Sequence, residues 1–285
     1  MCRLFGLTAS PTRVHASFWL LEAADSLLEQ RLRNPDGTGL GYFAPVVGAV
    51  IDKEPLPAYE DPAFVREAKH VSSTTFVSHI RYATTGERTT ENTHPFAMDG
   101  MLFAHSGMLQ DLDALESHLG RDIRFVGGDT DSERYFALIA KEIRARGSIG
   151  PGISAAVSWI AENLPVYSMN FVLATGNELW AFRYPETHPL FVLERGAGGE
   201  VGGRDLHHVS GTMRVHVPDL RRHPSVVVAN EPLDDTTGWR PLESGELVRV
   251  GQDLAVRSSI VIDRRPNLIR LGHAKGERMP GHARP

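Results

Sequence analysis

The sequence contains very little cysteine, because its 285 residues include a single one, Cys2. One cysteine excludes an intrachain disulfide and a zinc cluster built from cysteines, and this usage is typical of a reducing cytosolic compartment. No apolar run reaches the roughly 18 residues that a membrane-spanning helix requires. The N-terminus also lacks a charged segment followed by an apolar one and a cleavage site. We therefore expect a cytoplasmic protein that does not enter a membrane.

A strong net charge is also absent. The formal net charge of −5 gives no general attraction to nucleic acid. With 41% hydrophobic and 23% charged residues, the composition is that of a globular protein and not of a disordered or fibrous one. A chain of this length can bury a full hydrophobic core, in one large domain or two small ones.

Short apolar segments predict strands in two groups, with a helical block between them. The first group covers 3–8, 40–43, 46–51, 76–82 and 101–105, and the second covers 166–174, 178–184, 190–194, 225–229, 247–250 and 259–263. Helical spacing of apolar residues predicts helices over 17–32, 131–146 and 153–163. This order favours an α+β fold with antiparallel sheets over alternating βαβ units.

Domain boundaries are indicated near the C-terminus only. We expect one domain over residues 2–263. Residues 264–285 carry six Lys and Arg against one Glu, with Pro and Gly between them, which predicts a flexible basic tail.

Cys2 follows an initiator methionine that cells routinely remove before a small side chain. Once Met1 is removed, Cys2 carries both a thiol, with a reference pKa of about 8.5, and an α-amine of about 7.7–8.0 that can take the thiol proton. This pattern indicates an N-terminal nucleophile. The alternative is a buried strand residue, since a small residue at position 2 is common.

The segment SHIRYATTG places two polar side chains on one face of a predicted strand. Side chains alternate along a strand, so His79 and Arg81 point to the same side. The guanidinium fork of Arg81 matches a carboxylate, which makes it a candidate for binding the α-carboxylate of an amino acid. The alternatives are an internal ion pair for Arg81 and a core position for His79, and for His79 we favour the core position.

Two further segments supply candidate pocket groups. ENTHPF places His94 in a polar loop before a proline, which taken alone is only a turn. In FAHSGML a predicted strand ends at His105, and the following Ser106 and Gly107 predict a sharp bend that exposes backbone N–H groups. Such groups stabilise an oxyanion when they lie near a nucleophile, although an ordinary tight turn explains Gly107 equally well.

The segment GGDTDSE carries a helix start. Thr130 followed by Glu133 forms a capping-box pattern, which places Asp131 in the first turn of a helix. An acid at this position complements the helix dipole whether or not it binds a ligand. Opposite Arg81, its carboxylate would be suited to an α-ammonium group.

Cofactor motifs are missing. NPDGTGLGYF lacks the Lys-Ser/Thr of a phosphate-binding P-loop, and we interpret it as a turn near the site. His79, His94 and His105 are not at metal-ligand spacing, although their convergence in space is an alternative that would give a metallohydrolase. We expect no cofactor and no metal.

Taken together, these segments resemble the class II glutamine amidotransferases, which are N-terminal-nucleophile (Ntn) hydrolases. The matching segments, in the family's order, are MCRLFG, NPDGTGLGYF, SHIRYATTG, ENTHPF, FAHSGML and GDTDSE. VVVANEPLDD and the later Gly-Trp are similar to stand-alone members, among them the γ-glutamyl hydrolases of the ergothioneine pathway. The resemblance implies a four-layer αββα sandwich of two antiparallel sheets. It also implies a role for each matching residue: Cys2 is the nucleophile, Gly107 an oxyanion donor, Arg81 and Asp131 bind the substrate, and His94, Thr84 and Thr85 shape the pocket.

Ser106 departs from the family pattern, which has Asn at this position as a second oxyanion donor. Loss of one such donor typically lowers turnover about 10²–10³-fold.

The resemblance implies a function as well, the hydrolysis of a γ-glutamyl amide, glutamine or a conjugate, through a thioester on Cys2. The alternative is a weak or inactive amino-acid-binding module. A partner protein that accepts ammonia is left open.

Overall fold

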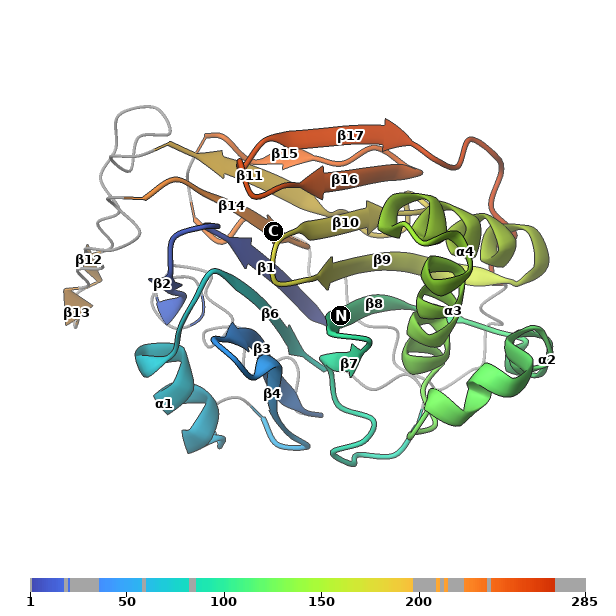
Figure 1. Cartoon of the computed structure of the whole chain (residues 1–285), viewed down its shortest axis with the longest axis horizontal. Helices are drawn as coiled ribbons and strands as arrows, with labels where there is room; N and C mark the ends of the chain where they lie inside the picture. The colour runs from blue at the N-terminus through green and yellow to red at the C-terminus, as the bar shows by residue number, and fades with distance from the viewer. Residues whose placement is uncertain are drawn as a thin grey trace.

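A computed structural model of the chain describes residues 2–17, 20, 36–57, 60–81, 86–196, 209–210, 213–214, 223–234 and 237–269. Within these residues the strands form two large antiparallel sheets that lie face to face, with helices on their outer sides (Figure 1). Most of the helix predicted over 17–32 lies outside the described residues. No helix in the described part of the chain is long and apolar enough to cross a membrane.

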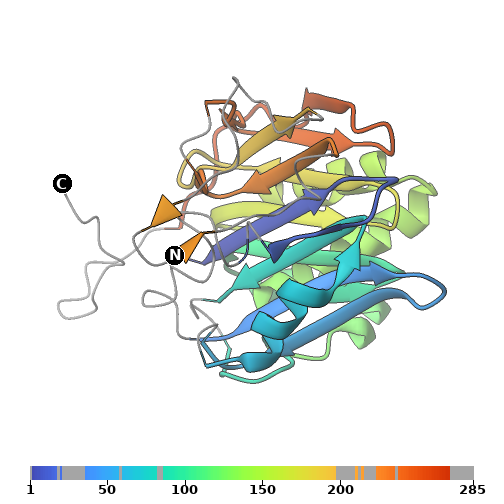
Figure 2. The ribbon, with the colours of Figure 1, turned by 90° about the vertical axis from the view of Figure 1, so that its left-hand side faces the viewer.

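The first sheet has seven strands in the order β15-β11-β14-β1-β6-β3-β4. β1 pairs with β14 on one side and with β6 on the other, so the segment directly after Cys2 lies in the middle of the sheet (Figure 2). The strands of this sheet are β1 (Arg3–Thr8), β3 (Thr38–Ala44), β4 (Gly48–Glu54), β6 (Thr75–Ile80), β11 (Phe191–Arg195), β14 (Ser225–Ala229) and β15 (Arg240–Pro241).

The second sheet has six strands in the order β17-β16-β10-β9-β8-β7. These strands are β7 (Phe96–Met98), β8 (Met101–Leu109), β9 (Val166–Ala174), β10 (Leu179–Arg183), β16 (Glu246–Val250) and β17 (Val256–Ile260). Two short pairs complete the strands: β2 (Val14–His15) with β5 (Ser72–Ser73), and β12 (Val209–Ser210) with β13 (Met213–Arg214).

Helices cover the outer face of each sheet. α1 (Pro62–His70) packs on the first sheet through Phe64 and Ala68. α3 (Asp131–Arg146) and α4 (Ile149–Asn163) pack on the second, and α2 (Leu112–Leu119) leads into a 3-10 helix, Gly120–Phe125. The predicted α+β, four-layer αββα sandwich is confirmed.

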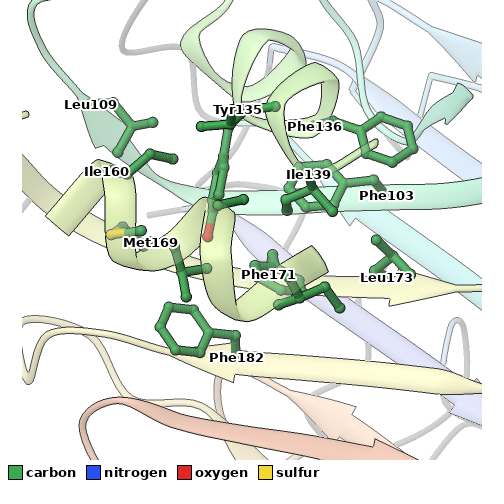
Figure 3. Close-up of a cluster of buried hydrophobic side chains, with 14 of the residues drawn as sticks. Phe103, Leu109, Tyr135, Phe136, Ile139, Ile160, Met169, Phe171, Leu173 and Phe182 are labelled. Carbon is green, nitrogen blue, oxygen red and sulfur yellow. The ribbon is translucent and has the colours of Figure 1, made fainter. Parts of the chain in front are cut away.

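Strand alternation divides the side chains between the layers. In β1, Phe5 and Leu7 point toward α1, whereas Leu4 and Gly6 point toward the second sheet. A Cβ atom on Gly6 would lie 2.7 Å from Cγ1 of Val172 in the opposite sheet, so the two sheets approach closely there. The outer core under α3 and α4 consists of large apolar side chains, including Phe103 (Figure 3).

Most predicted elements lie where the apolar pattern placed them, with β1, β9, β14 and α3 matching residue for residue. The predicted strand 259–263 is wrong, because β17 spans Val256–Ile260. Two helices were not predicted. One of them is α1, whose start is fixed by Asp61, because its carboxylate accepts the N–H groups of Ala63 and Phe64 at 3.0 Å each.

The first residues of the predicted tail are bound to the domain. Val166 donates its N–H to the carbonyl of Asn267 at 2.8 Å and accepts the N–H of Ile269 at 3.1 Å. Arg264 forms an ion pair with Glu162 at 2.8 Å. Residues 264–269 are therefore held against the second sheet, and residues 270–285 lie outside the described residues.

Candidate active site

Cys2 lies immediately before β1 and is half-buried. Its carbonyl accepts a hydrogen bond from Nδ2 of Asn230 at 2.9 Å. By strand alternation its side chain falls on the same face as Leu4, which packs in the layer between the sheets. The thiol is thus directed to the end of this inter-sheet layer.

Arg81 lies across the sheet from Cys2. β1 and β6 pair Arg3 with Ile80, so Cys2 and Arg81 are the next residues in the same register. The Arg81 side chain is buried, and its guanidinium donates to the carbonyls of Glu87 at 2.9 Å and Gly86 at 3.2 Å. These carbonyls hold the fork in place at the same end of the layer as the thiol.

The charges around Arg81 link three of the predicted site residues. Burial lowers the pKa of Arg81, whereas the negative charges of Asp36, Cys2 and Asp131 raise it. Cys2 and Asp131 are therefore both close enough to Arg81 to act on its charge. Asp36 also forms an ion pair with Arg88, and its N–H donates to the Arg81 carbonyl at 3.3 Å, so Asp36 lies beside Arg81. Asn34 and Pro35, the first residues of the segment interpreted as a turn, lie outside the described residues.

His79 and His94 form a fully buried pair with ring centroids 4.2 Å apart. Within the described residues, neither ring has a hydrogen-bond partner at either nitrogen. Burial, reinforced by neighbouring His105 and Arg81, lowers the pKa of His79 to about 3, and burial likewise holds the pKa of His94 well below its usual value. Both rings are therefore neutral near pH 7. His79 is a core histidine, as favoured above, but one whose nitrogens are not satisfied.

The sharp bend predicted after His105 is wrong. β8 continues through Ser106 and Gly107 to Leu109 and pairs with β9 along this stretch. Gly107 is required for a different reason: a Cβ atom there would lie 1.8 Å from the carbonyl oxygen of Ser168. The close approach of β9, and not a turn, selects the glycine.

The N–H of Gly107 nevertheless points out of the β8–β9 ladder. Its partner Met169 donates its own N–H toward β10, to the carbonyl of Tyr184 at 2.7 Å. Since the N–H and C=O of a strand residue point to the same side, Gly107 and Met169 form a non-hydrogen-bonded pair. In the described chain β7 pairs only with Met101–Phe103 of β8, so no strand covers the other side of β8 at Gly107.

Asp131 lies at this same uncovered edge of β8. One of its carboxylate oxygens accepts the N–H of Leu109 at 2.8 Å, and the side chain is buried. It is the first residue of α3, whose N-cap Thr130 accepts the N–H of Glu133 at 3.2 Å, as predicted. Glu133 itself reaches back to the N–H of Gly128 at 2.7 Å.

Ser106 pairs with Asn170 and is buried. Alternation places its hydroxyl on the face of Ala104, in the layer between the sheets. The neighbouring Asn170 amide donates to the carbonyls of His188 at 3.1 Å and Pro189 at 3.2 Å. Asn170 therefore holds a loop with its amide, and Ser106 has only a hydroxyl to offer.

His105 connects β8 to its neighbours. Its Nε2 lies 3.1 Å from the carbonyl of Ser168, which can only accept, so Nε2 carries the proton and Nδ1 accepts from the hydroxyl of Ser132 at 2.9 Å. Both nitrogens are occupied. Among the described residues no group of three or more His, Cys, Asp and Glu side chains could hold a metal ion.

Some site residues lie beyond these observations or were not anticipated. Thr84 and Thr85 fall outside the described residues. Sequence reasoning did not anticipate Asn230 or the ion-paired Asp36 as site residues. Asn230 had a signal, since it lies in the segment VVVANEPLDD quoted above, but only the fold brings it to Cys2.

Known proteins with similar sequences identify the family of this chain. The family model of class-II glutamine amidotransferases matches residues 1–267. YafJ of Escherichia coli (strain K12) is 27% identical over 259 residues, which are 86% of this chain and 96% of that protein. Gamma-glutamyl-hercynylcysteine sulfoxide hydrolase of Mycobacterium tuberculosis is 26% identical over 224 residues, 78% of this chain and 77% of the relative.

Solved structures share the fold. Glutamine phosphoribosylpyrophosphate amidotransferase from B. subtilis superposes on this chain with a TM-score of 0.63 and 18% sequence identity. The superposition covers 92% of this chain and 50% of that enzyme. A glutamine aminotransferase class-II domain protein from Silicibacter pomeroyi gives 0.57 at 19% identity, covering 92% of this chain and 100% of that one. The two-sheet sandwich is thus the Ntn-type glutamine amidotransferase fold.

Proposed function

The chain belongs to the class-II glutamine amidotransferases, a family of amidohydrolases, and from that premise we propose that it hydrolyses a γ-glutamyl amide bond through a thioester on Cys2. The observation that carries the proposal is the position of Cys2, which precedes the central strand and lies across the sheet from Arg81, at the end of the layer that also contains Ser106. In this proposal a nucleophile, a cation and an uncovered backbone N–H act together at one end of the layer between the sheets.

Substrate binding follows from the charges. Arg81 binds the α-carboxylate of the glutamyl group, because a guanidinium fork matches a carboxylate. Asp131 binds the α-ammonium, and its buried carboxylate is one of the charges that act on Arg81. His94, Thr84 and Thr85 shape the pocket around the side chain. The γ-amide then extends toward Cys2.

The reaction proceeds in two steps. The α-amine of Cys2, once Met1 is removed, takes the thiol proton, and the sulfur attacks the γ-carbonyl carbon. The N–H of Gly107 and the hydroxyl of Ser106 stabilise the oxyanion. The protonated amine gives its proton to the leaving nitrogen, and ammonia or an amine departs. Water, deprotonated by the same amine, attacks the thioester and releases glutamate.

The decisive experiment compares the protein with its Cys2→Ala variant. Protein from which Met1 has been removed, verified by intact mass, is incubated with glutamine and with a panel of γ-glutamyl amides, and released glutamate is measured. We expect release from at least one substrate and none above background from the variant. Equal release from both proteins would refute the thioester on Cys2.

The size of the leaving group is the finer part of the proposal. A relative of this chain is named for hydrolysis of γ-glutamyl-hercynylcysteine sulfoxide, which supports a γ-glutamyl conjugate as well as glutamine. The same panel separates the two, since a conjugate hydrolase shows a higher kcat/KM for bulky amines than for ammonia as the leaving group. If glutamine is preferred, a partner protein that receives ammonia becomes the expected context.

A binding module without turnover is the second candidate, and Ser106 is the observation that favours it. A hydroxyl at the oxyanion position is shorter than a carboxamide. This candidate predicts glutamate binding by calorimetry that is lost in Arg81→Ala, together with no glutamate release from any member of the panel.

A further inference from the structure

The hydrogen bonds at the start of β1 are unusual on the side that faces β14. The register pairs Phe5 with Ala229, so Leu4 lies opposite Asn230. Asn230 donates its backbone N–H to the carbonyl of Leu4 at 3.3 Å, as the ladder requires. The N–H of Leu4, however, donates to the side-chain Oδ1 of Asn230 at 3.0 Å and not to its backbone carbonyl.

The next ladder position explains why a side chain is used. In an antiparallel pair hydrogen-bonded positions alternate, so the carbonyl of Cys2 would accept from the residue opposite it, which is Pro232. Proline has no N–H, and the ladder therefore ends before it reaches Cys2. The carbonyl of Cys2 instead accepts from Nδ2 of Asn230 at 2.9 Å.

We propose that Asn230 is a positioning residue for the nucleophile, because one carboxamide takes the place of two ladder hydrogen bonds and fixes the peptide plane that follows Cys2. This inference rests on the proposed function of Cys2. An N-terminal nucleophile has no preceding residue, so the peptide that follows it is its only backbone attachment to the fold. Without the carboxamide, the Cys2 carbonyl would lose this contact, and the thiol and α-amine would move together.

The neighbouring pair supports the same interpretation. Arg3 lies opposite Glu231, and its Nε is 3.1 Å from a carboxylate oxygen of Glu231. Side chains directly opposite each other in an antiparallel pair stabilise that pairing. Asn230 itself is 8% exposed, so its two hydrogen bonds are largely shielded from competing water. Asn230 and Glu231 thus continue the sheet by side chains where Pro232 stops the backbone.

Two variants of similar shape test the role. Asn230→Asp keeps an acceptor for the N–H of Leu4 but places an oxygen against the Cys2 carbonyl. Asn230→Leu removes both contacts. The matched control is Ser73→Ala, which removes a buried hydroxyl that bonds the N–H and carbonyl of Phe43 at 3.1 and 3.0 Å, at the opposite end of the same sheet.

Activity is measured as kcat and KM per reactive Cys2, counted by labelling with a glutamine-analogue electrophile. We expect kcat to fall about 10–100-fold in both Asn230 variants, since a displacement of about 1 Å at a reacting group has effects of this size. KM should stay within about twofold, because Arg81 and Asp131 are unchanged. Ser73→Ala should lower the melting temperature and leave kcat unchanged.

A second readout does not depend on turnover. The chain has one cysteine, so the rate of alkylation by iodoacetamide, followed by intact mass on protein lacking Met1, reports on Cys2 alone. Iodoacetamide reacts with the thiolate, and a carboxylate at position 230 would raise the pKa of the nearby Cys2 thiol, so Asn230→Asp should shift the alkylation midpoint to higher pH, and Asn230→Leu should not. Wild-type midpoints and wild-type kcat per labelled Cys2 in both variants would overturn the inference. If the wild type hydrolyses no γ-glutamyl compound, the proposed function fails, and the alkylation profiles still decide the role of Asn230.

Discussion

Two buried regions of the molecule have opposite character. Beneath α3 and α4, aromatic rings pack on one another (Figure 3). The ring centroid of Phe103 lies 4.8 Å from that of Phe136, on which it stacks, and 5.3 Å from that of Phe171. Between the sheets near Cys2, the buried side chains are instead His79, Arg81 and other polar groups. The named side chains are buried in both regions, but only the second region buries polar groups, whose desolvation costs free energy.

The difference shows where stability comes from. A buried polar group without a partner costs about 1–3 kcal/mol, and within the described residues His79 and His94 leave all four ring nitrogens without one. Large apolar side chains contribute about 1.5–3 kcal/mol each when buried, and the outer layer supplies many of them. The outer layer thus offsets the cost of the polar groups around the site, and it meets them where the ring of Phe96 lies 4.6 Å from the ring of His94, centroid to centroid.

The largest expected effect removes a ring from the outer layer. Phe171→Ala should lower the free energy of unfolding by about 3–5 kcal/mol, the range for deleting a buried aromatic side chain. Chemical denaturation measures this change. At a temperature where the variant is folded, its kcat should equal that of the wild type, and a large loss of kcat would contradict the separation of the two layers.

The next effect concerns the polar layer and appears in the rate, not in stability. Ser106→Asn supplies the second oxyanion donor that the family pattern contains, and kcat for γ-glutamyl hydrolysis should rise about 10–100-fold, somewhat less than the loss usually seen when such a donor is removed. Steady-state kinetics on the preferred amide measures it. Ser106→Ala is the control, and equal rates for Ser106→Asn and Ser106→Ala would mean that the side chain at 106 does not reach the oxyanion.

The smallest effect separates the layers by pH. The pKa of His79 in the folded protein is about 3, below the value near 6.5 of an unfolded chain, so the unfolded state binds the proton first. Stability is therefore complete above about pH 6.5 and falls as the pH drops toward 3. The His79→Phe variant lacks this contribution. When the pH falls from 6 to 4.5, its free energy of unfolding should therefore decrease by about 2 kcal/mol less than that of the wild type.

Denaturant titrations at several pH values measure this slope. Phe171→Ala serves as the comparison, because an apolar variant lowers the free energy of unfolding by the same amount at every pH. Parallel pH curves for His79→Phe and the wild type would show that His79 carries no buried penalty.

Local signals made part of the site predictable. Thr130 and Glu133 lie three residues apart, and this spacing alone located Asp131 at the start of α3. The strands predicted over 166–174 and 178–184 are equally local, since they form the β9–β10 hairpin, in which the N–H of Thr175 donates to the carbonyl of Glu178 at 2.9 Å. In both cases the two contacting residues are three positions apart in the sequence, so the local pattern alone predicts the contact.

Distant contacts were not predictable. The sequence predicts a bend at Gly107, and this prediction is wrong because nothing near Gly107 in the sequence reveals that the carbonyl of Ser168 in β9 would collide with a side chain. The pairing of His79 with His94 and the contact of Asn230 with Cys2 likewise depend on which strands become neighbours. One sequence identifies such residues as candidates, and the register of the sheets decides what they do.

The central position of β1 has a consequence for how the protein is made. β1 leaves the ribosome long before one of its two neighbours, β14, which consists of Ser225–Ala229. The partner of the Cys2 carbonyl is 228 residues further along the chain. Contacts of such large sequence separation form slowly and late. A nascent chain can therefore form the β6 side of β1 early, whereas the β14 side waits until nearly all of the domain has been synthesised. A chain that ends before Asn230 lacks the carboxamide that holds the Cys2 carbonyl.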